Sequence, residues 1–425
     1  MKPLKVLIFL LSMPILVWAQ GMTLEECQRL AQENYPLIKR YSLIEQTTGY
    51  TIRNISKGWL PQVSASAQAT LQNDVMSFPD ALKGVFDQMG QELKGLSKSQ
   101  YRVGIDINQT VFDGGNIRSQ KEVARLQGDV QTAQNEVDLY AIRQRVNDLY
   151  FSILLTDERL KVNDDLQTLL ESNLSKLNSM LNNGLAMESD VSSMKAEQIK
   201  ARQQRTELNA TRKSLCRMLA FMCGVNEIQY VTMPPKNNVE QGVNRPELKL
   251  IDTQLRLADA QDKLLESSIL PRMSLFAQGY YGYPGYNTFE DMFSRKWSLN
   301  GMIGARLTWN ISQLYTNKGE KAKIQMQRLQ TENARETFLF NNALQQVQQN
   351  EEIAKYNQLI EDDANIVSLR EEVRKAAESK LTHGIIDTNS LLQEINHENQ
   401  AKIKLATHEM MLLQLIENLK YTTGN

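Results

Sequence analysis

The sequence predicts a mixed, mainly α-helical protein made of two copies of one unit of strands and long helices. Two observations carry this prediction: short motifs recur at fixed offsets, and long stretches of the chain contain almost no glycine or proline. Self-similarity of this kind is typical of architectures in which one copy cannot bury its apolar surface alone. A third observation, the alternation of apolar and polar residues in four short segments, predicts the strands.

The duplication is visible in matched motifs. Leu60-Pro61 recurs as Leu270-Pro271, Gly104 recurs as Gly304, and the segment 181–185 recurs as 381–385. The first pair lies 210 residues apart and the other two lie 200 apart, because one loop around 74–100 is longer than its counterpart. We therefore divide the chain into a first repeat over 20–230 and a second over 231–425.

Residues 1–19 are expected to be a signal peptide. Two lysines precede an apolar run over 6–17, and Ala19 provides the small residue before the cleavage site. A membrane anchor is the alternative, but the run is shorter than the roughly 20 residues that a span needs, and Pro14 interrupts it. The protein is therefore expected to be exported, without a lipid anchor.

The first repeat is expected to contain helices over about 22–57, 116–183 and 188–223, and strands over about 60–73 and 100–112. Its long helix has one glycine, Gly128, and a stripe of leucines at helical spacing: Leu166, Leu170, Leu174, Leu177 and Leu181. At 1.5 Å per residue this helix is about 100 Å long, so its partners must be other long helices packed as coiled coils.

The second repeat is expected to contain helices over about 245–268, 316–383 and 388–422, and strands over about 270–283 and 297–311. Its long helix shows a looser stripe: Ile353, Ile360, Val367, Val373 and Leu381. Gly184 and Gly384 end the two long helices, because glycine accepts the left-handed conformation at a helix C-terminus. Each repeat thus contains a helical hairpin with a glycine at its tip.

The four strands alternate apolar and polar residues, with Phe276 and Met302 out of step. Such alternation is typical of a membrane barrel with a wet interior, and also of a soluble half-buried sheet. The signal peptide, the long helices and the aromatic residues at the strand ends favour the barrel. The expected aromatic residues are Trp59 and Trp309 at one rim, and Tyr280, Tyr281, Tyr283 and Trp297 at the other.

Four strands cannot close a barrel, because the smallest transmembrane barrels use eight. An open sheet edge in lipid is not viable, so the chain must oligomerise, and cyclic symmetry is the usual route. Composition does not distinguish three copies from two or four.

The remaining composition argues against enzymes and nucleic-acid binding. Net charge is −1, and the three histidines lie at spacings that match no metal site. We find no phosphate-binding glycine loop and no ordered nucleophile and base, so we expect no cofactor, no metal and no catalysis. Cys216 and Cys223 lie seven residues apart on a predicted helix, about 10 Å, too far for a disulfide, so buried thiols are expected.

The order of helix, strand, loop, strand, long helix and returning helix resembles the TolC family of outer-membrane efflux proteins. The resemblance covers essentially the whole mature chain. It rests on the Leu-Pro strand openings at Leu60 and Leu270, on the junction Val111-Phe112-Asp113-Gly114-Gly115, and on the glycine-bearing tips. In the second copy that junction is replaced by Ile311-Ser312-Gln313-Leu314-Tyr315.

The resemblance implies a homotrimer in the outer membrane of a Gram-negative bacterium. Three chains would form a twelve-stranded barrel in outer-membrane lipid and a twelve-helix tunnel in the periplasm. The implied partners are a periplasmic adaptor, also called a membrane fusion protein, and an inner-membrane pump of the resistance-nodulation-division or ABC type. The implied cargo is drugs, toxic small molecules or proteins. The tips at Gly184, Leu185, Gly384 and Ile385 would dock the adaptor.

The resemblance also places a periplasmic aperture just after the second tip. Family members carry aspartates six and nine residues past the tip glycine, where this chain has Ser390 and Gln393. The acidic gate is therefore absent there, and Asp387 and Glu394 are the nearby candidates. A capping box, with Ser390 as N-cap and Gln393 three residues on, is the favoured local role for this pair. In the first copy, Asp190 matches the family's aspartate.

A periplasmic helical-hairpin scaffold or adaptor of an export complex is the alternative. Such proteins combine long hairpins with β structure, but usually have one hairpin rather than two.

Overall fold

The computed structural model describes residues 21–90, 92–236 and 242–424. The expected signal peptide, 1–19, lies outside these residues. The chain divides into two compact units. The first comprises Met1–Tyr41, Ala133–Lys249 and Arg335–Asn425, and the second comprises Ser42–Thr132 and Leu250–Ala334.

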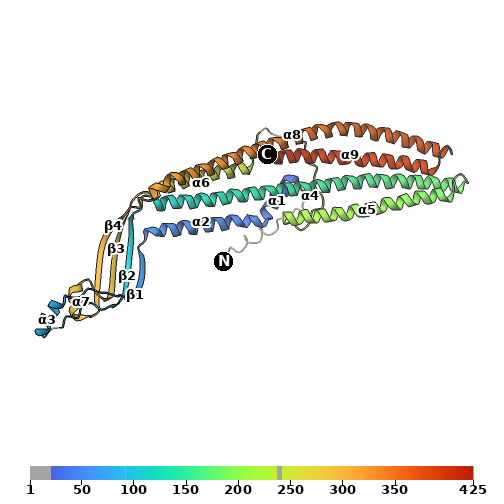
Figure 1. The fold of residues 1–425 in the computed structure, drawn as a ribbon. Helices are drawn as coiled ribbons and strands as arrows, with labels where there is room; N and C mark the ends of the chain where they lie inside the picture. Colours follow the sequence, from blue (N-terminus) through green and yellow to red (C-terminus); the bar gives the residue numbers. More distant parts are fainter. Residues whose placement is uncertain (1–20, 91, 237–241, 425) are drawn as a thin grey trace, which may run out of the picture. The chain divides into compact units, whose positions relative to one another are not determined.

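The second unit contains a four-stranded antiparallel sheet with the order β1-β2-β3-β4 (Figure 1). The strands are β1 (Gln62–Leu71), β2 (Ser99–Phe112), β3 (Arg272–Tyr283) and β4 (Ser298–Thr308). Both copies of the repeat therefore contribute one hairpin each, and the central pairing of β2 with β3 joins them. β1 and β4 are the open edges of the sheet. The sequence therefore predicted the number of strands and their alternation correctly.

The register separates two faces of the sheet. Ala65, Ile105, Gly279 and Gly301 form one cross-strand row, and Ser64, Asp106, Gln278 and Met302 form the adjacent row on the opposite face. The first face is apolar along every strand and the second is mostly polar. Side chains of the apolar face are open in the single subunit, for example Ile303 at 84% and Leu299 at 83% exposure.

Glycines on neighbouring strands accommodate the bulky residues of the polar face. Phe276 pairs with Gly304, where an added Cβ would lie 2.7 Å from the Phe276 ring. Tyr280 pairs with Gly104, where an added Cβ would lie 2.9 Å from the Tyr280 Cβ. The repeated glycines, 200 residues apart, thus explain why Phe276 breaks the alternation: an aromatic ring covers the surface that each glycine leaves bare.

Gly282→Ala is expected to destabilise the sheet by about 1–3 kcal/mol through overpacking. An added Cβ would lie 2.4 Å from the Tyr101 carbonyl oxygen and 2.7 Å from the Arg102 Cα, and backbone atoms cannot move aside cheaply. Gly279→Ala on the same strand is the control, because its nearest neighbour is 3.9 Å away. The thermal midpoint of oligomer dissociation in detergent measures the difference. Equal midpoints for the two variants would show that the close approach at Gly282 is not structurally important.

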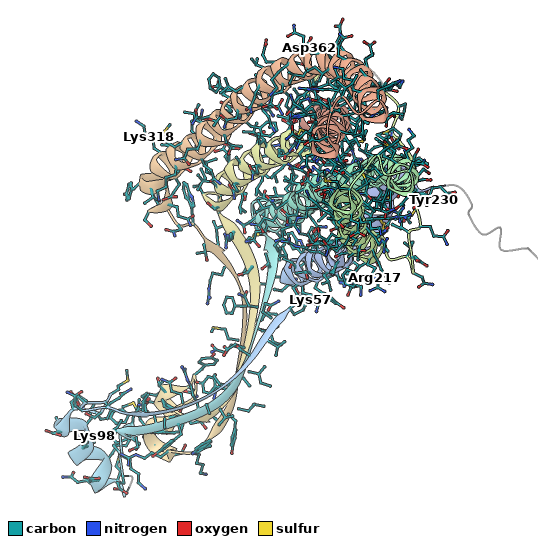
Figure 2. The ribbon with its side chains drawn as sticks, turned by 90° about the vertical axis from the view of Figure 1, so that its right-hand side faces the viewer. Lys57, Lys98, Arg217, Tyr230, Lys318 and Asp362 are labelled. Carbon is teal, nitrogen blue, oxygen red and sulfur yellow. The ribbon has the colours of Figure 1, made fainter. Side chains whose placement is uncertain are left out.

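The loops at one end of the sheet contain two short helices that the sequence did not indicate, α3 (Asp80–Gln88) and α7 (Thr288–Ser294). A small cluster of Leu96, Tyr283 and Met292 packs there. Lys57 and Lys98 mark opposite ends of the sheet in Figure 2. The rest of this unit includes most of α2 (Arg40–Ser56) and α6 (Pro246–Ser268), and the first parts of the long helices.

The first unit holds two helical hairpins, which Figure 1 shows side by side. They are α4 (Asn116–Asn182) with α5 (Glu188–Cys223), and α8 (Gln313–Thr382) with α9 (Thr388–Thr423). α4 and α8 also contribute their first turns to the second unit. No described helix is long and apolar enough to cross a membrane.

The helix expected over 22–57 is interrupted. It is divided into α1 (Leu24–Asn34), a 3₁₀ turn (Pro36–Lys39) and α2. Tyr35 is extended, because the proline that follows disfavours the helical conformation of the residue before it.

Two apolar clusters hold the first unit together. Near the tips, one cluster joins α4, α5, α8 and α9 and includes Leu170, Leu177 and Leu391. A second cluster surrounds Tyr150 and joins α1, α4, α5 and α9. Its thiols, Cys27, Cys216 and Cys223, are buried and unpaired, as predicted for the latter two. The leucine stripe of the first long helix is therefore confirmed as an inner face.

The stripe predicted for the second long helix is wrong in part. Val373 is 46% exposed, whereas its neighbour Arg374 is buried. Asn342, Gln349 and Asp363 are also buried, so the face of α8 that packs within the subunit is largely polar. The apolar stripe of this helix is weak because some of its apolar residues, such as Val373, face away from the rest of the subunit.

Candidate functional site

The two hairpin tips in the first unit have the same backbone structure. Gly184 (φ 73°) follows α4, and Gly384 (φ 69°) follows α8. The Leu185 N–H donates to the Met180 carbonyl at 2.8 Å, and the Ile385 N–H donates to the Lys380 carbonyl at 2.9 Å. Together with bonds from each glycine N–H, this is the Schellman arrangement that satisfies the last carbonyls of a helix.

The residues after the glycines are apolar and exposed. Leu185 is 71% and Ile385 is 69% exposed, although the residue in this position of a Schellman motif often packs back on its own helix. Met187, which the sequence analysis did not single out, lies between Leu185 and the start of α5 and is 72% exposed. Each tip thus presents bare apolar side chains on a rigid turn, which suits contact with another protein.

Gly384→Val is expected to destabilise the second tip by about 1–2 kcal/mol, because a left-handed conformation is costly for a residue with a Cβ. No atom lies within 4 Å of the added Cβ, so backbone strain alone is tested. Gly384→Asn is the control, since asparagine tolerates this conformation. Hydrogen exchange of the amides over 380–388 measures the effect. Similar protection in the valine and asparagine variants would refute the strain at this position.

Two of the aperture candidates, Asp387 and Asp190, act as helix caps in the structure. Asp387 is the N-cap of α9: its carboxylate accepts from the Ser390 N–H at 2.9 Å and from the Ser390 hydroxyl at 2.5 Å. These bonds, with the hydroxyl contributing most, lower the pKa of Asp387. The predicted capping box of Ser390 with Gln393 is therefore wrong, because the acidic residue three positions earlier is the better acceptor. The cap is ionised at neutral pH and is lost only as pH falls through the lowered pKa.

Asp190 plays the reciprocal role in the first repeat. Its carboxylate accepts from the Met187 N–H at 2.9 Å at the start of α5. Gln393 is exposed on α9, and Glu394 is half-buried and pairs with Arg370 at 3.4 Å. The single subunit does not bring these five side chains together into one cluster.

A buried charge network that the sequence analysis missed links α8, α9 and α4. Arg374 pairs with Glu398 and, at 3.0 Å, with Glu378. Glu398 also pairs with Lys402 at 2.7 Å, and Asn173 of α4 donates to Glu378 at 2.9 Å. The sequence gives no signal for such a network, because its residues are polar and charged like those of a solvent-exposed helix face.

The predicted rim aromatics lie at the two ends of the sheet. Trp59 precedes β1 and Trp309 follows β4, so both lie towards the same end of the sheet, and both are exposed. At the other end, Tyr281 and Trp297 are exposed, with ring centroids 5.4 Å apart. Tyr101, which was not predicted, stacks on Trp297 at 6.4 Å.

Tyr280 and Tyr283 differ from this expectation. Both lie at the same end of the sheet but are buried. The Tyr283 hydroxyl donates to the Asp291 carbonyl at 3.3 Å and accepts from the Ser97 N–H at 3.0 Å, and Tyr280 donates to the Pro284 carbonyl at 3.1 Å. Within the subunit these two rings anchor the loops instead of facing outward.

In the described ranges, no group of three or more His, Cys, Asp or Glu side chains is placed to hold a metal ion.

Comparison with known proteins agrees with this architecture. Residues 29–225 match the family model described as outer membrane efflux protein. No curated protein matches the chain significantly.

Solved structures match over nearly the full length. VceC, an outer membrane protein of Vibrio cholerae, is 13% identical with a TM-score of 0.66, covering 95% of this chain and 96% of that one. The MtrE outer membrane channel of Neisseria gonorrhoeae is 14% identical with a TM-score of 0.66, covering 95% and 89%. The CmeC outer membrane channel of Campylobacter jejuni is 12% identical with a TM-score of 0.64, covering 94% and 85%.

The fold of this chain is therefore that of the outer membrane protein VceC and of the outer membrane channels MtrE and CmeC. Within residues 29–225 the sequence itself is similar to the outer membrane efflux protein family.

Proposed function

We propose that three copies of this chain form the outer-membrane exit duct of a tripartite efflux or type I secretion system. The duct passively conducts drugs, toxic small molecules or proteins that an inner-membrane pump delivers through a periplasmic adaptor. The observation that carries the proposal is the incompleteness of the subunit: both edges of its sheet are open and one sheet face is bare and apolar. In lipid such a sheet must be closed by further copies.

The long helix α8 supports the same conclusion independently. Its outward face carries exposed apolar residues in two groups, each with spacings of three and four: Phe340, Leu344 and Val347, and then Ile366, Leu369 and Val373. This spacing is that of a coiled-coil seam without a partner. Because the apolar stripe and the open edges occur in one chain, a second copy of that chain is the partner that covers both.

The tips are proposed as the adaptor-docking surface, formed by Gly184, Leu185, Gly384 and Ile385. The exposed Leu185 and Ile385 on rigid Schellman turns support this role. Asp190, Asp387, Ser390, Gln393 and Glu394 are proposed to lie around the periplasmic aperture, with caps rather than a paired acidic gate. Trp59, Tyr281, Trp297 and Trp309 are proposed to mark the membrane rims.

The adaptor or scaffold alternative is less well supported. It predicts one hairpin beside a small β domain, whereas the first unit contains two equivalent hairpins and the fold matches channels over its length.

Deletion of the gene is expected to raise susceptibility to toxic compounds or to abolish secretion of a protein, with recovery on re-expression. Double replacement of Leu185 and Ile385 by serine should impair recovery while leaving the oligomer intact. The control is Met218→Ser on the exposed face of α5, which is 52% exposed and distant in sequence from both tips. Full recovery by the double variant would remove the tips from the mechanism. A deletion without any transport phenotype would contradict the proposed function.

A further inference from the structure

The strands of the sheet carry few charged side chains, and all of them lie on one face. They are Arg102, Asp106, Arg272 and Arg306. The register places each of them on the polar face, opposite residues such as Gln68, Ser64, Thr308 and Ser274. The apolar face contains none. Since charges avoid lipid, the face that carries all of them is the one that faces the water-filled interior of a closed barrel.

This face has three guanidinium groups and one carboxylate per subunit. Among the described residues, none of these arginines forms an ion pair. Asp106 lies four residues from Arg102 along β2, which is about 13 Å in a strand and too far for a direct contact. Across the sheet its partners are Ser64 and Gln278.

A neighbouring subunit cannot neutralise these arginines from the adjoining strand. The sheet order leaves β1 and β4 as edges, so closure places β1 of one copy against β4 of the next. β1 contains no ionisable residue. The three-to-one excess of arginine over aspartate is therefore kept on the strands of the whole barrel.

The arginines occupy both ends of the sheet. Arg102 lies towards the loops, across from Gln68 and Gly282. Arg272 and Arg306 lie near the opposite end, and the Arg306 guanidinium stacks over the Phe276 ring at 4.9 Å from its centroid. Phe276 in turn covers Gly304. The stacking holds one cationic group in place against the wall instead of leaving it to extend freely.

The loops beyond Arg102 do not reverse this charge. Segments 72–98 and 284–297 contain six acidic and five basic residues, which nearly cancel. One acidic member, Asp291, is buried, and its carboxylate accepts from the Gly285 N–H at 2.6 Å.

We infer that the barrel interior is electropositive, and that Arg102, Arg272 and Arg306 make the barrel part of the channel favour anions, including cargo that carries carboxylate or phosphate groups, over cations. The inference rests on the proposed function and names a substrate preference for it. A low-dielectric wall lined by one sign of charge concentrates counter-ions, and rings of arginine are a recognised basis of anion preference in pores. This preference does not require the pump itself to select between neutral and acidic cargo.

The test is the reversal potential of the purified full-length channel in a planar bilayer under a KCl gradient. Ionic strength is kept low, because at 0.1 M the Debye length of about 10 Å already screens charges across a wide pore. The acidic residues proposed around the periplasmic aperture are unchanged in every variant, so the effect of the arginines is the change in the chloride-to-potassium permeability ratio relative to the wild type. Combined Arg102→Gln, Arg272→Gln and Arg306→Gln should lower the chloride-to-potassium permeability ratio by roughly threefold or more.

The combined Arg→Lys replacement at the same three positions is the matched control and should stay near the wild-type ratio, because it keeps the charge. An unchanged ratio in the glutamine variant would overturn the inference while leaving the channel intact. Absence of any single-channel conductance together with absence of an oligomer would instead overturn the proposed function itself. The two failures are therefore separately recognisable.

Discussion

Ala67→Arg is expected to abolish assembly of the barrel. Ala67 pairs with Val103 on the apolar face of the sheet, where the side chains are exposed in the single subunit. Arginine on the lipid face costs about 2–4 kcal/mol near the bilayer midplane. Three copies in one barrel multiply this cost to roughly 6–12 kcal/mol, comparable to the whole stability of a typical folded domain.

Ser66→Arg provides the matched control for this prediction. Ser66 is the adjacent residue of the same strand and pairs with Gly104 on the polar face. In that position arginine would reach water, so the oligomer should form. The measurement is the fraction of heat-dissociable oligomer recovered from outer membranes. Normal assembly of the Ala67→Arg variant would show that this face does not contact lipid.

Arg374→Leu is expected to destabilise the helical unit by about 3–5 kcal/mol, because breaking a buried ion pair leaves the partner charge uncompensated. Arg374 and Glu398 are both buried, with Glu398 only 2% exposed. The pair links α8 to α9 close to the tips, where Glu378 and Asn173 extend it to α4. The loss should appear as a lower thermal midpoint of unfolding followed by circular dichroism.

The double variant Arg374→Leu with Glu398→Leu is the decisive control. Replacing a buried pair by apolar residues is often close to neutral, so the double variant should regain much of the lost stability. Lys375→Leu, on the neighbouring exposed position with a surface pair to Glu371, should change stability little. A double variant as unstable as the single one would show that the buried pair is not the origin of the effect.

The fold could be predicted from the sequence because several local signals indicated the same order of strands and helices. The matched glycines at the tips, the period-two strands and the glycine-poor helices each specify a backbone conformation that few alternatives satisfy. The tips adopt the left-handed turns that glycine at these positions favours. Pro36 carried a signal of its own, which the expectation of one continuous helix over 22–57 overlooked.

The remaining features could not be found from local patterns. Phe276 breaks the strand period because of Gly304 on another strand, and the pairing emerges only with the register. The face of α8 that is buried within one subunit is polar, whereas many of its apolar residues are exposed in the single subunit. Arg374 belongs to this polar buried face, and its charge alone would predict a solvent-exposed residue. Single-chain periodicity does not distinguish burial within a subunit from burial between subunits.

The account depends on several subunits completing one cylinder across lipid, and the mass of the mature protein in detergent tests this claim most directly. Light scattering with correction for bound detergent is expected to give three chain masses in a single species. A preparation that remains monodisperse as single chains in buffer without detergent would contradict the account.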